Sequence, residues 1–396
     1  MMTKEKEARP IRSSESGTVR RIKQYTLLTR LGQGSFAEVF LAKSDVDETY
    51  CAAKVFDKSL LRRKRTISRT VEGFKIHSEL DKVDKEIGIM KKLVHPNLVR
   101  LLEVIDDKKD NQLFLLMEFV ELGPVMKYDR ETNKFTSTVT GGLCEERLAG
   151  QYLLDIASGL GYLHLHHIAH RDLKPDNVLL GKLGRCKIAD FGVAHYFEED
   201  HANDKTLSVR SLERSHSRAQ IRDTQGTYCF WAPEMIQGDK KFNAYSCDMW
   251  AAGVCYFIFV TGKLPFYAES PVEMFDFIAQ ASPVIPNTLS NHSRRVIFGL
   301  LATNIDTRLT VQDLQSDPWL KSTELHSTAN GPDNLHLSAG DIHHAFPTMT
   351  VKQRMSVCLS GARNSIASTL SQASEAFHQI RRRSYTFQGS QTGPNE

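Results

Sequence analysis

The residues His170-Arg171-Asp172-Leu173-Lys174-Pro175-Asp176-Asn177 form the stretch of this 396-residue chain that decides its fold. Asp190-Phe191-Gly192 begins eighteen residues after Asp172. Further along lie Ala232-Pro233-Glu234, Asp248-Met249-Trp250 and a late arginine, Arg308. Short motifs are weak evidence one at a time. Several separated motifs that occur in a fixed order are much stronger evidence for a particular fold.

Upstream of this stretch lies a glycine-containing turn, Gly32-Gln33-Gly34-Ser35-Phe36-Ala37-Glu38-Val39. A glycine pair alone is typical of many hairpins, because glycine tolerates positive φ. The pattern continues as a strand and not as a helix, so it is neither a Rossmann turn nor a P-loop. Fifteen residues after Val39 comes Lys54, inside the apolar run Ala52–Val55. An unpaired buried charge is costly, so Lys54 is expected to face an anion or a carboxylate.

A predicted helix over residues 80–93 offers that carboxylate. Glu86 lies beside the apolar stripe of this helix, where an acid is expected to have a partner, and it is our first candidate to pair with Lys54. Asp84, on a different face, is the competing candidate, and a solvated helix acid is the remaining interpretation of Glu86. The stripe itself consists of Leu80, Val83, Ile87, Met90 and Leu93, at helical spacing.

The chain divides by composition into an arm, a domain and a tail. Residues 1–24 carry seven basic and three acidic residues and few large apolar groups, so a flexible arm is expected. Residues 25–320 form the predicted domain, and residues 321–396 a tail rich in Ser and Thr. Strands dominate about 25–120 and helices about 121–320. This order predicts an α+β fold with a small β-rich lobe carrying one helix, a larger helical lobe and a cleft between them.

Apolar periodicity sets the expected elements. The expected strands are Tyr25–Leu31, Val39–Lys43, Cys51–Phe56 and Leu113–Phe119. The expected helices beyond residue 145 are Glu146–Leu165, Ala244–Thr261, Val272–Ala279, Ser293–Thr303 and Val311–Leu320. Residues 201–219, rich in Ser, His and Arg, are expected to be a disordered insertion.

Composition narrows the class of protein. Hydrophobic residues make up 41% and charged residues 25% of the chain, which is ordinary for a globular protein and excludes wholesale disorder. The longest apolar run, Ala251–Val260, is too short to cross a bilayer, so no transmembrane segment is expected. The charged N-terminus is no secretory signal, and the seven scattered cysteines are typical of reduced thiols. We therefore expect a cytoplasmic protein, with the nucleus as an alternative, and no nucleic-acid partner.

In its ordered motifs the sequence over residues 25–320 resembles the eukaryotic protein kinase family. Lys174 and Thr227 match its serine/threonine branch, so the resemblance implies transfer of the ATP γ-phosphate to protein Ser or Thr hydroxyls, with Mg²⁺ as the second cofactor. It implies that Asp172 receives or orients the proton of the attacking hydroxyl, and that Lys174 balances charge near the γ-phosphate. The metal ligands it implies are Asn177 and Asp190, which supply the hard oxygens that Mg²⁺ prefers.

The resemblance also implies a nucleotide pocket. Lys54 would hold the α- and β-phosphates, oriented by Glu86. Thr224 stands three residues before Thr227, where many kinases carry an activating phosphate, so both are candidate regulatory residues. A pseudokinase scaffold is the contrasting interpretation, which the full set of catalytic side chains opposes. The remaining pocket residues implied are Leu31, Gly32, Gly34, Val39, Ala52, Met117, Glu118, Val120 and Leu179.

Within this family the sequence is similar to the calcium/calmodulin-dependent kinase kinase group. Gly123-Pro124-Val125-Met126 carries the likeness most strongly, together with Tyr25-Thr26-Leu27 and His95-Pro96-Asn97. The group implies that the protein substrate is the activation loop of another kinase. The insertion over residues 58–75 departs from the group because it is basic but lacks proline, and another subgroup remains the alternative.

The tail carries a candidate amphipathic helix ending in Arg381-Arg382-Arg383. A basic amphipathic helix is typical of a calmodulin target or of a membrane-surface helix, whereas its many serines favour an ordinary tail. We expect calmodulin as a possible partner that relieves inhibition by the tail. The apolar face consists of Ile366, Leu370, Ala373, Phe377 and Ile380.

Overall fold

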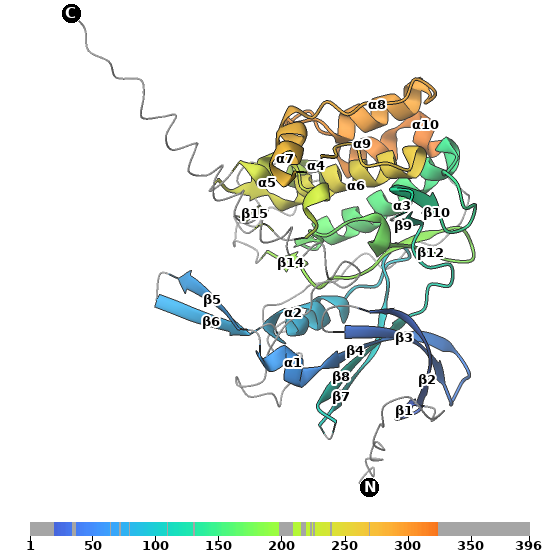
Figure 1. The fold of residues 1–396 in the computed structure, drawn as a ribbon, viewed down its shortest axis with the longest axis vertical. Coiled ribbons are helices and arrows are strands. Elements are labelled where there is room, and N and C mark those ends of the chain that lie inside the picture. Colours follow the sequence, from blue (N-terminus) through green and yellow to red (C-terminus); the bar gives the residue numbers. More distant parts are fainter. Residues whose placement is uncertain are drawn as a thin grey trace, which may run out of the picture. The chain divides into compact units, whose positions relative to one another are not determined.

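The computed structural model divides the chain into two compact units (Figure 1). Of the described residues, the first unit contains those up to Glu121 together with Ala189–Val193, and the second contains Leu122–Ile188 and those from Ala194 to Thr323. The residues that the structure describes are 20–33, 37–63, 65–70, 73–78, 80–108, 110–129, 131–197, 209–214, 219–221, 224, 226–237, 240–268 and 270–323.

The first unit is built on a six-stranded antiparallel sheet with the strand order β1-β2-β3-β4-β8-β7. Strand β4 lies inside the sheet, pairing with β3 on one side and with β8 on the other. The strands are β1 (Arg20–Ile22), β2 (Tyr25–Gln33), β3 (Ala37–Ser44), β4 (Tyr50–Asp57), β7 (Leu101–Asp107) and β8 (Gln112–Glu118).

Apolar side chains bury both faces of this sheet. Alternate residues of β4 point to opposite sides, so this strand contributes side chains to both faces. Helix α2 (Leu80–Met90) packs its Val83 and Ile87 against one face. The face beneath α2 contributes Ala37, Phe56, Leu113 and Leu115 to this core. The opposite face is closed by Ile22, Leu27, Ala42, Cys51, Ala53, Val55, Ile105, Phe114 and Leu116.

The basic insertion of residues 58–75 begins with a short helix, α1 (Lys58–Arg63). A two-stranded hairpin follows, in which β5 (Arg65–Thr70) pairs antiparallel with β6 (Gly73–Ser78). Figure 1 shows this hairpin projecting from the first unit beside α2. The insertion therefore forms a strand pair separate from the six-stranded sheet.

The second unit is mainly helical and is organised around α6 (Ala244–Thr261). The Asn243 side chain caps this helix by accepting hydrogen bonds from the backbone N–H groups of Tyr245 and Ser246. Gly262 ends it with φ +68°. In the described part of the chain α6 alone is long and apolar enough to span a membrane, but 94% of it is buried inside the protein. It is the central helix of this core.

The other helices of the second unit are α3 (Glu146–Leu165), α4 (Val209–Glu213), α5 (Pro233–Ile236), α7 (Pro271–Gln280), α8 (Asn291–Leu300), α9 (Val311–Ser316) and α10 (Pro318–Lys321), with 3₁₀ turns at Pro175–Asn177 and Tyr228–Phe230. Helices α3, α4 and α8 pack against α6, whereas α9 and α10 pack on α3, and α7 packs on α5 (Figure 1). The short strand pairs are β9 (Met126–Asp129) with β10 (Lys134–Ser137), β11 (Ile168–Ala169) with β14 (His195–Tyr196), β12 (Val178–Leu180) with β13 (Cys186–Ile188), and β15 (Gln220–Ile221) with β16 (Phe242–Asn243).

The structure differs from the sequence-based expectations at several boundaries. Arg20–Ile22 belong to the sheet and not to a flexible arm, because Ile22 is buried in the core of the first unit. At the other end Thr323, expected in the tail, is buried. The helix expected over Val311–Leu320 is broken, because Asp317 caps a new helix with Pro318 as its first residue. Residues 1–19 and the candidate tail helix lie outside the described residues.

Residues 201–219 were expected to be disordered, and this prediction is wrong for their described part. Residues 209–213 form helix α4, with Leu212 buried in a cluster with Tyr245. The segment lacks a long apolar stripe, so its pattern did not reveal a helix of five residues. A single buried leucine and several polar contacts hold it in place.

Candidate active site

Lys54 is the centre of the polar site in the first unit. It lies in β4, paired with Val39 of β3 and with Leu115 of β8, so its side chain shares the face that α2 covers. Its Nζ atom is 2.7 Å from Glu86 Oε1 and 3.0 Å from Asp190 Oδ1. The expected pairing of Lys54 with Glu86, and not with the competing acid of the same helix, is therefore present.

The electrostatics of this group follow from its burial. Burial alone would lower the pKa of Lys54, but the charges of Asp190 and Glu86 and their hydrogen bonds outweigh it and raise that pKa. Burial raises the pKa of Glu86, and the Lys54 charge opposes that rise. Glu86 has only 2% of its side chain exposed, whereas Asp190 is 48% exposed. Lys54 is thus held charged, with one carboxylate buried and another open to solvent.

The backbone at Asp190 has a conformation that the sequence did not reveal. Its φ is +63°, in the left-handed region that residues other than glycine seldom adopt. The next residue, Phe191, is buried. A Cβ atom at Gly192 would lie 3.3 Å from Asp190 Oδ1 and 3.6 Å from Glu86 Oε2. Glycine therefore leaves room for the two carboxylates beside Lys54.

The residues expected around a nucleotide base fall into two groups. In the first unit Ala52 pairs with Met117, and Gly32 with Val39, on adjacent strands. Also in the first unit, the Glu118 N–H donates to the Arg100 carbonyl at 2.8 Å, Val120 is buried, and Leu31 is 48% exposed. Leu179 lies in β12 of the second unit. Gly34 lies outside the described residues.

Asp172 is the centre of the polar site in the second unit. Its carboxylate lies 2.6 Å from Lys174 Nζ, and it accepts hydrogen bonds from the Thr227 N–H at 2.9 Å and from the Thr227 hydroxyl at 3.0 Å. Lys174 Nζ also donates to Thr227 Oγ1 at 3.0 Å. The Asn177 amide nitrogen donates to the Asp172 backbone carbonyl at 2.7 Å and to the Asp172 carboxylate at 3.3 Å. One carboxylate thus organises a lysine, a threonine and an asparagine.

Thr224 and Thr227, both expected to be regulatory, occupy different environments. The Thr227 side chain belongs to the Asp172 group, as its contacts with Lys174 and Asp172 show. Thr224 is partly buried, and its immediate neighbours on both sides lie outside the described residues. A regulatory role for either residue stays a prediction.

Gly226, which sequence reasoning missed, lies directly against Arg171 and Asp172. These two residues belong to the candidate catalytic loop, His170–Asn177, which is called the catalytic loop below. Its φ is +87°, and a Cβ atom there would lie 2.4 Å from the Arg171 carbonyl oxygen and 3.0 Å from Asp172 Oδ1. No side chain larger than hydrogen fits without moving the backbone. The signal in the sequence was a glycine next to Thr227, but only the structure shows which backbone it approaches.

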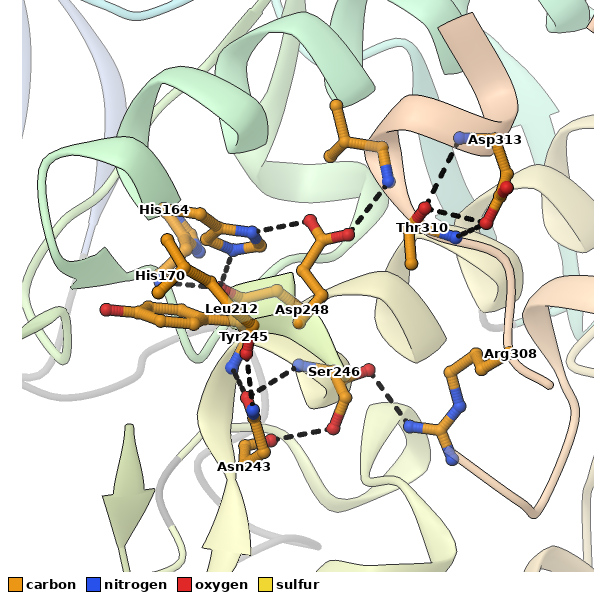
Figure 2. A network of polar contacts seen from close by, with 12 residues as sticks. His164, His170, Leu212, Asn243, Tyr245, Ser246, Asp248, Arg308, Thr310 and Asp313 are labelled. Carbon is orange, nitrogen blue, oxygen red and sulfur yellow. Dashed lines mark hydrogen bonds and ion pairs between the residues drawn. The ribbon is translucent and has the colours of Figure 1, made fainter. Parts of the chain in front are cut away.

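Asp248 holds the backbone just before Asp172. Its Oδ2 accepts the His170 N–H at 2.9 Å, and its Oδ1 accepts the Arg171 N–H at 2.8 Å. Arg171 has φ +70°, so this pair of hydrogen bonds stabilises a left-handed residue next to Asp172. Figure 2 shows Asp248 between His164 and the loop that contains His170.

Glu234 and Arg308, which belong to two of the separated motifs, form an ion pair. Arg308 Nη1 is 2.6 Å from Glu234 Oε1, and Nη2 is 2.9 Å from Oε2. Burial would raise the pKa of Glu234, but the charge and hydrogen bonds of Arg308 lower it. The guanidinium also lies 5.2 Å from the centre of the Trp250 ring. The pair links helix α5 to the segment before α9. Both residues are distant in the sequence from Lys54 and Asp172.

Comparison with known families agrees with this geometry. A family model described as the protein kinase domain matches residues 25–320. The chain belongs to the protein kinase family. As a kinase it has the antiparallel sheet with one helix, followed by the helical region, that the sequence predicted.

Curated relatives place the kinase among serine/threonine enzymes. The serine/threonine-protein kinase GRIK2 of Arabidopsis thaliana is 32% identical over 80% of this chain and 70% of its own length. The calcium/calmodulin-dependent protein kinase kinase of Caenorhabditis elegans is 33% identical over 80% of this chain and 56% of its own. The serine/threonine-protein kinase ssp1 of Schizosaccharomyces pombe is 32% identical over 75% of this chain and 42% of its own. The chain is therefore a protein serine/threonine kinase, a phosphotransferase similar to the kinase kinase group.

Proposed function

We propose that this protein is an upstream kinase, which uses ATP and Mg²⁺ to phosphorylate the activation loop of another protein kinase. The observation that carries the substrate class is the similarity to a calcium/calmodulin-dependent protein kinase kinase at 33% identity. The Gly123-Pro124-Val125-Met126 segment supports it from within the chain. This segment runs beside β12, where the Val125 N–H donates to the Val178 carbonyl and the Leu180 N–H donates to the Gly123 carbonyl.

The donor set of the chain fits a magnesium nucleotide. Asp190 offers a carboxylate that is half exposed beside a lysine, and the Asn177 amide uses its nitrogen on Asp172, so that its oxygen is oriented as an acceptor. Mg²⁺ prefers such hard oxygen ligands. When bound, Mg²⁺ would neutralise charge on the phosphate oxygens. Lys54 would bind the α- and β-phosphates, and Glu86 would keep its ammonium in place.

For phosphoryl transfer, positioning and charge neutralisation supply most of the catalysis. Asp172 is oriented by Lys174 and by Thr227, so its carboxylate would accept the hydrogen bond of the substrate hydroxyl and orient that oxygen for attack. Lys174, already 2.6 Å from Asp172, would balance the negative charge that gathers near the transferring group. The preference for Ser and Thr is supported by the similarity to serine/threonine-protein kinases.

The experiment that tests the proposed substrate uses a panel of catalytically inactive protein kinases as substrates, with labelled ATP and Mg²⁺. Each substrate kinase is also prepared with its activation-loop threonine changed to alanine. We expect labelling of at least one substrate and its loss in the alanine form. The Asp172→Asn protein is the control for contaminating activity. Labelling that persists in every alanine form would contradict an activation-loop target.

Regulation by calcium belongs to the same proposal. A calmodulin-binding tail over residues 364–383 lies outside the described residues, and it is supported by its apolar face and its arginine run. A chain shortened after Glu324 keeps the buried Thr323, so it preserves the folded core. This regulation would be supported if the shortened chain had a higher basal activity than the full chain and if calcium–calmodulin activated the full chain alone. Equal activity of both would exclude it.

A further inference from the structure

Helix α4 places a buried acid that the proposed reaction does not use. Glu213, its last residue, is only 2% exposed. Its Oε1 lies 2.8 Å from His164 Nδ1, and its Oε2 accepts the Val311 N–H at 3.0 Å. A buried carboxylate is costly unless it is paired and hydrogen-bonded. The two contacts supply that pairing, and they bring a residue from the segment between Asp190 and Glu234 onto α3.

His164 connects this acid to Asp248. Its Nε2 lies 3.0 Å from Asp248 Oδ2, so both ring nitrogens face a carboxylate. A neutral ring donates from one nitrogen only, whereas a protonated ring donates from both. Burial would lower the pKa of His164, but the hydrogen bonds and charges of Asp248 and Glu213 raise it to about 9. The Tyr245 ring, 4.6 Å away between centroids, also packs on the His164 ring.

The network ends on the catalytic loop. The Asp248 carboxylate that contacts His164 also accepts the backbone N–H group of His170 (Figure 2). It accepts the backbone N–H group of Arg171 as well. These two residues immediately precede Asp172. A continuous set of contacts therefore runs from Glu213 through His164 and Asp248 to the backbone that positions Asp172.

Helix α4 has other attachments that do not involve Glu213. The Leu212 carbonyl accepts a hydrogen bond from Asn243 Nδ2 at 2.8 Å, and the Leu212 side chain is buried. Arg210 and Arg214 both form ion pairs with Asp313 of α9. A change at Glu213 therefore leaves several contacts that hold the helix, so the role of its carboxylate is separable from docking of α4.

We propose that Glu213 is a positioning residue for the catalytic loop. Its carboxylate keeps His164 doubly protonated and oriented, and His164 in turn fixes Asp248 in the rotamer that holds the loop. The inference rests on the proposed role of Asp172 in catalysis. It assigns a function in turnover to a segment that the family motifs leave unassigned.

The test replaces Glu213 with glutamine, which keeps the size and an acceptor but removes the charge. We expect kcat to fall about tenfold while the KM for ATP stays within about twofold, because the loop is displaced but Lys54 and its partners are untouched. Glu213→Asp should recover part of the loss, since it restores the charge. Glu131→Gln, at an exposed acid between β9 and β10, is the matched control and should behave as the wild type.

Two readouts are independent of activity. Hydrogen exchange should show faster exchange at the His170 and Arg171 amides in Glu213→Gln, and NMR titration should show a lower pKa for His164. Unchanged exchange and titration would overturn the proposal, as would a kcat equal to that of the wild type. If both readouts change in a protein whose wild type phosphorylates no protein substrate, the structural coupling stands and the proposed function fails instead.

Discussion

Glu86 Oε1 lies 2.7 Å from the ammonium nitrogen of Lys54, and both side chains are buried. The pair joins helix α2 to strand β4, so the position of the helix and the direction of the lysine depend on each other. Burying either charge alone would be unfavourable, because its desolvation cost is offset only by the attraction to the other charge. The same lysine contacts Asp190 at 3.0 Å, which extends the dependence to a third segment of the chain.

The first prediction compares the two acids of α2. Glu86→Gln should lower kcat/KM for ATP by about 10²–10³-fold, because Lys54 loses the partner that orients it. Asp84→Asn should have a much smaller effect, since Lys54 keeps its contact with Glu86. Initial rates at varied ATP concentration measure both. Equal losses in the two variants would contradict the assignment of Glu86 as the partner that matters for nucleotide use.

The second prediction concerns the carboxylate of the catalytic loop. Asp172→Asn keeps the shape of the side chain but removes the acceptor that would orient the substrate hydroxyl, so kcat should fall about 10²–10⁴-fold. The nucleotide dissociation constant should change little, because Lys54 lies in the other unit of the chain. Peptide phosphorylation and displacement of a fluorescent nucleotide measure the two quantities. A variant with normal turnover would remove Asp172 from the mechanism.

The third prediction uses the close approach of Gly226 to the Arg171 carbonyl. Gly226→Ala combines a positive φ with a Cβ atom 2.4 Å from that oxygen, so the loop must shift. We expect a loss of about 1–3 kcal/mol in the free energy of unfolding and a larger loss of kcat. Gly142→Ala is the control, because nothing lies within 4 Å of a Cβ atom there. Urea denaturation and initial rates compare the two; similar behaviour of both variants would refute the steric argument.

Much of this architecture was predictable because it follows from periodic apolar patterns and from motifs with fixed spacing. The helix 146–165 and the helix 244–261 have the expected bounds, since each is a long segment rich in apolar residues. The pairing of Lys54 with Glu86 was expected from the cost of burying a single charge. These are properties that a residue type and its position along one element determine.

The features that were missed depend on distant segments. Nothing near Gly226 in the sequence indicates that it meets the Arg171 carbonyl, and nothing near Glu213 indicates its contact with His164, 49 residues away. The left-handed backbone at Asp190 is likewise not indicated by the neighbouring residues in the sequence. Sequence reasoning finds charges that need partners, but it does not say which partner the fold supplies.

The fourth prediction compares an ion pair whose arginine is buried with one whose arginine is half exposed. Arg308→Met leaves Glu234 without its partner, so the free energy of unfolding should fall by about 3–5 kcal/mol. Arg295→Ala breaks the pair with Asp317, in which the arginine is 52% exposed, and should cost no more than about 1 kcal/mol. Urea denaturation at neutral pH measures both, and equal costs would contradict the structural role of Arg308.

The pKa of Glu234 adds a dependence on pH to that prediction. Because this pKa is lowered in the folded protein, the stability that ionised Glu234 contributes is present above its unfolded pKa and is lost as the pH falls through the folded value. The advantage of the wild type over Glu234→Gln should therefore shrink on acidification below about pH 4. An advantage that is unchanged by acid would show that the carboxylate is not ionised in the pair.

The last prediction uses the buried His164 with its two carboxylates. Its pKa is raised to about 9, so its contribution to stability is fully present below the unfolded value of about 6.5 and is lost as the pH rises through about 9. Glu213→Gln removes one of the charges that raise this pKa, and its folded value should be lower. The free energy of unfolding of the wild type minus that of the variant should be constant near pH 6.5 and should shrink as the pH approaches 9. Burial raises the pKa of Glu213 itself, which only the wild type contains. The remaining titrating groups are common to both proteins and cancel in the difference. Urea denaturation at several pH values, with Glu131→Gln as the control, measures it. A difference that is flat across the whole range would mean that His164 is not protonated between Glu213 and Asp248, and the charge-based coupling to the catalytic loop would lose its basis.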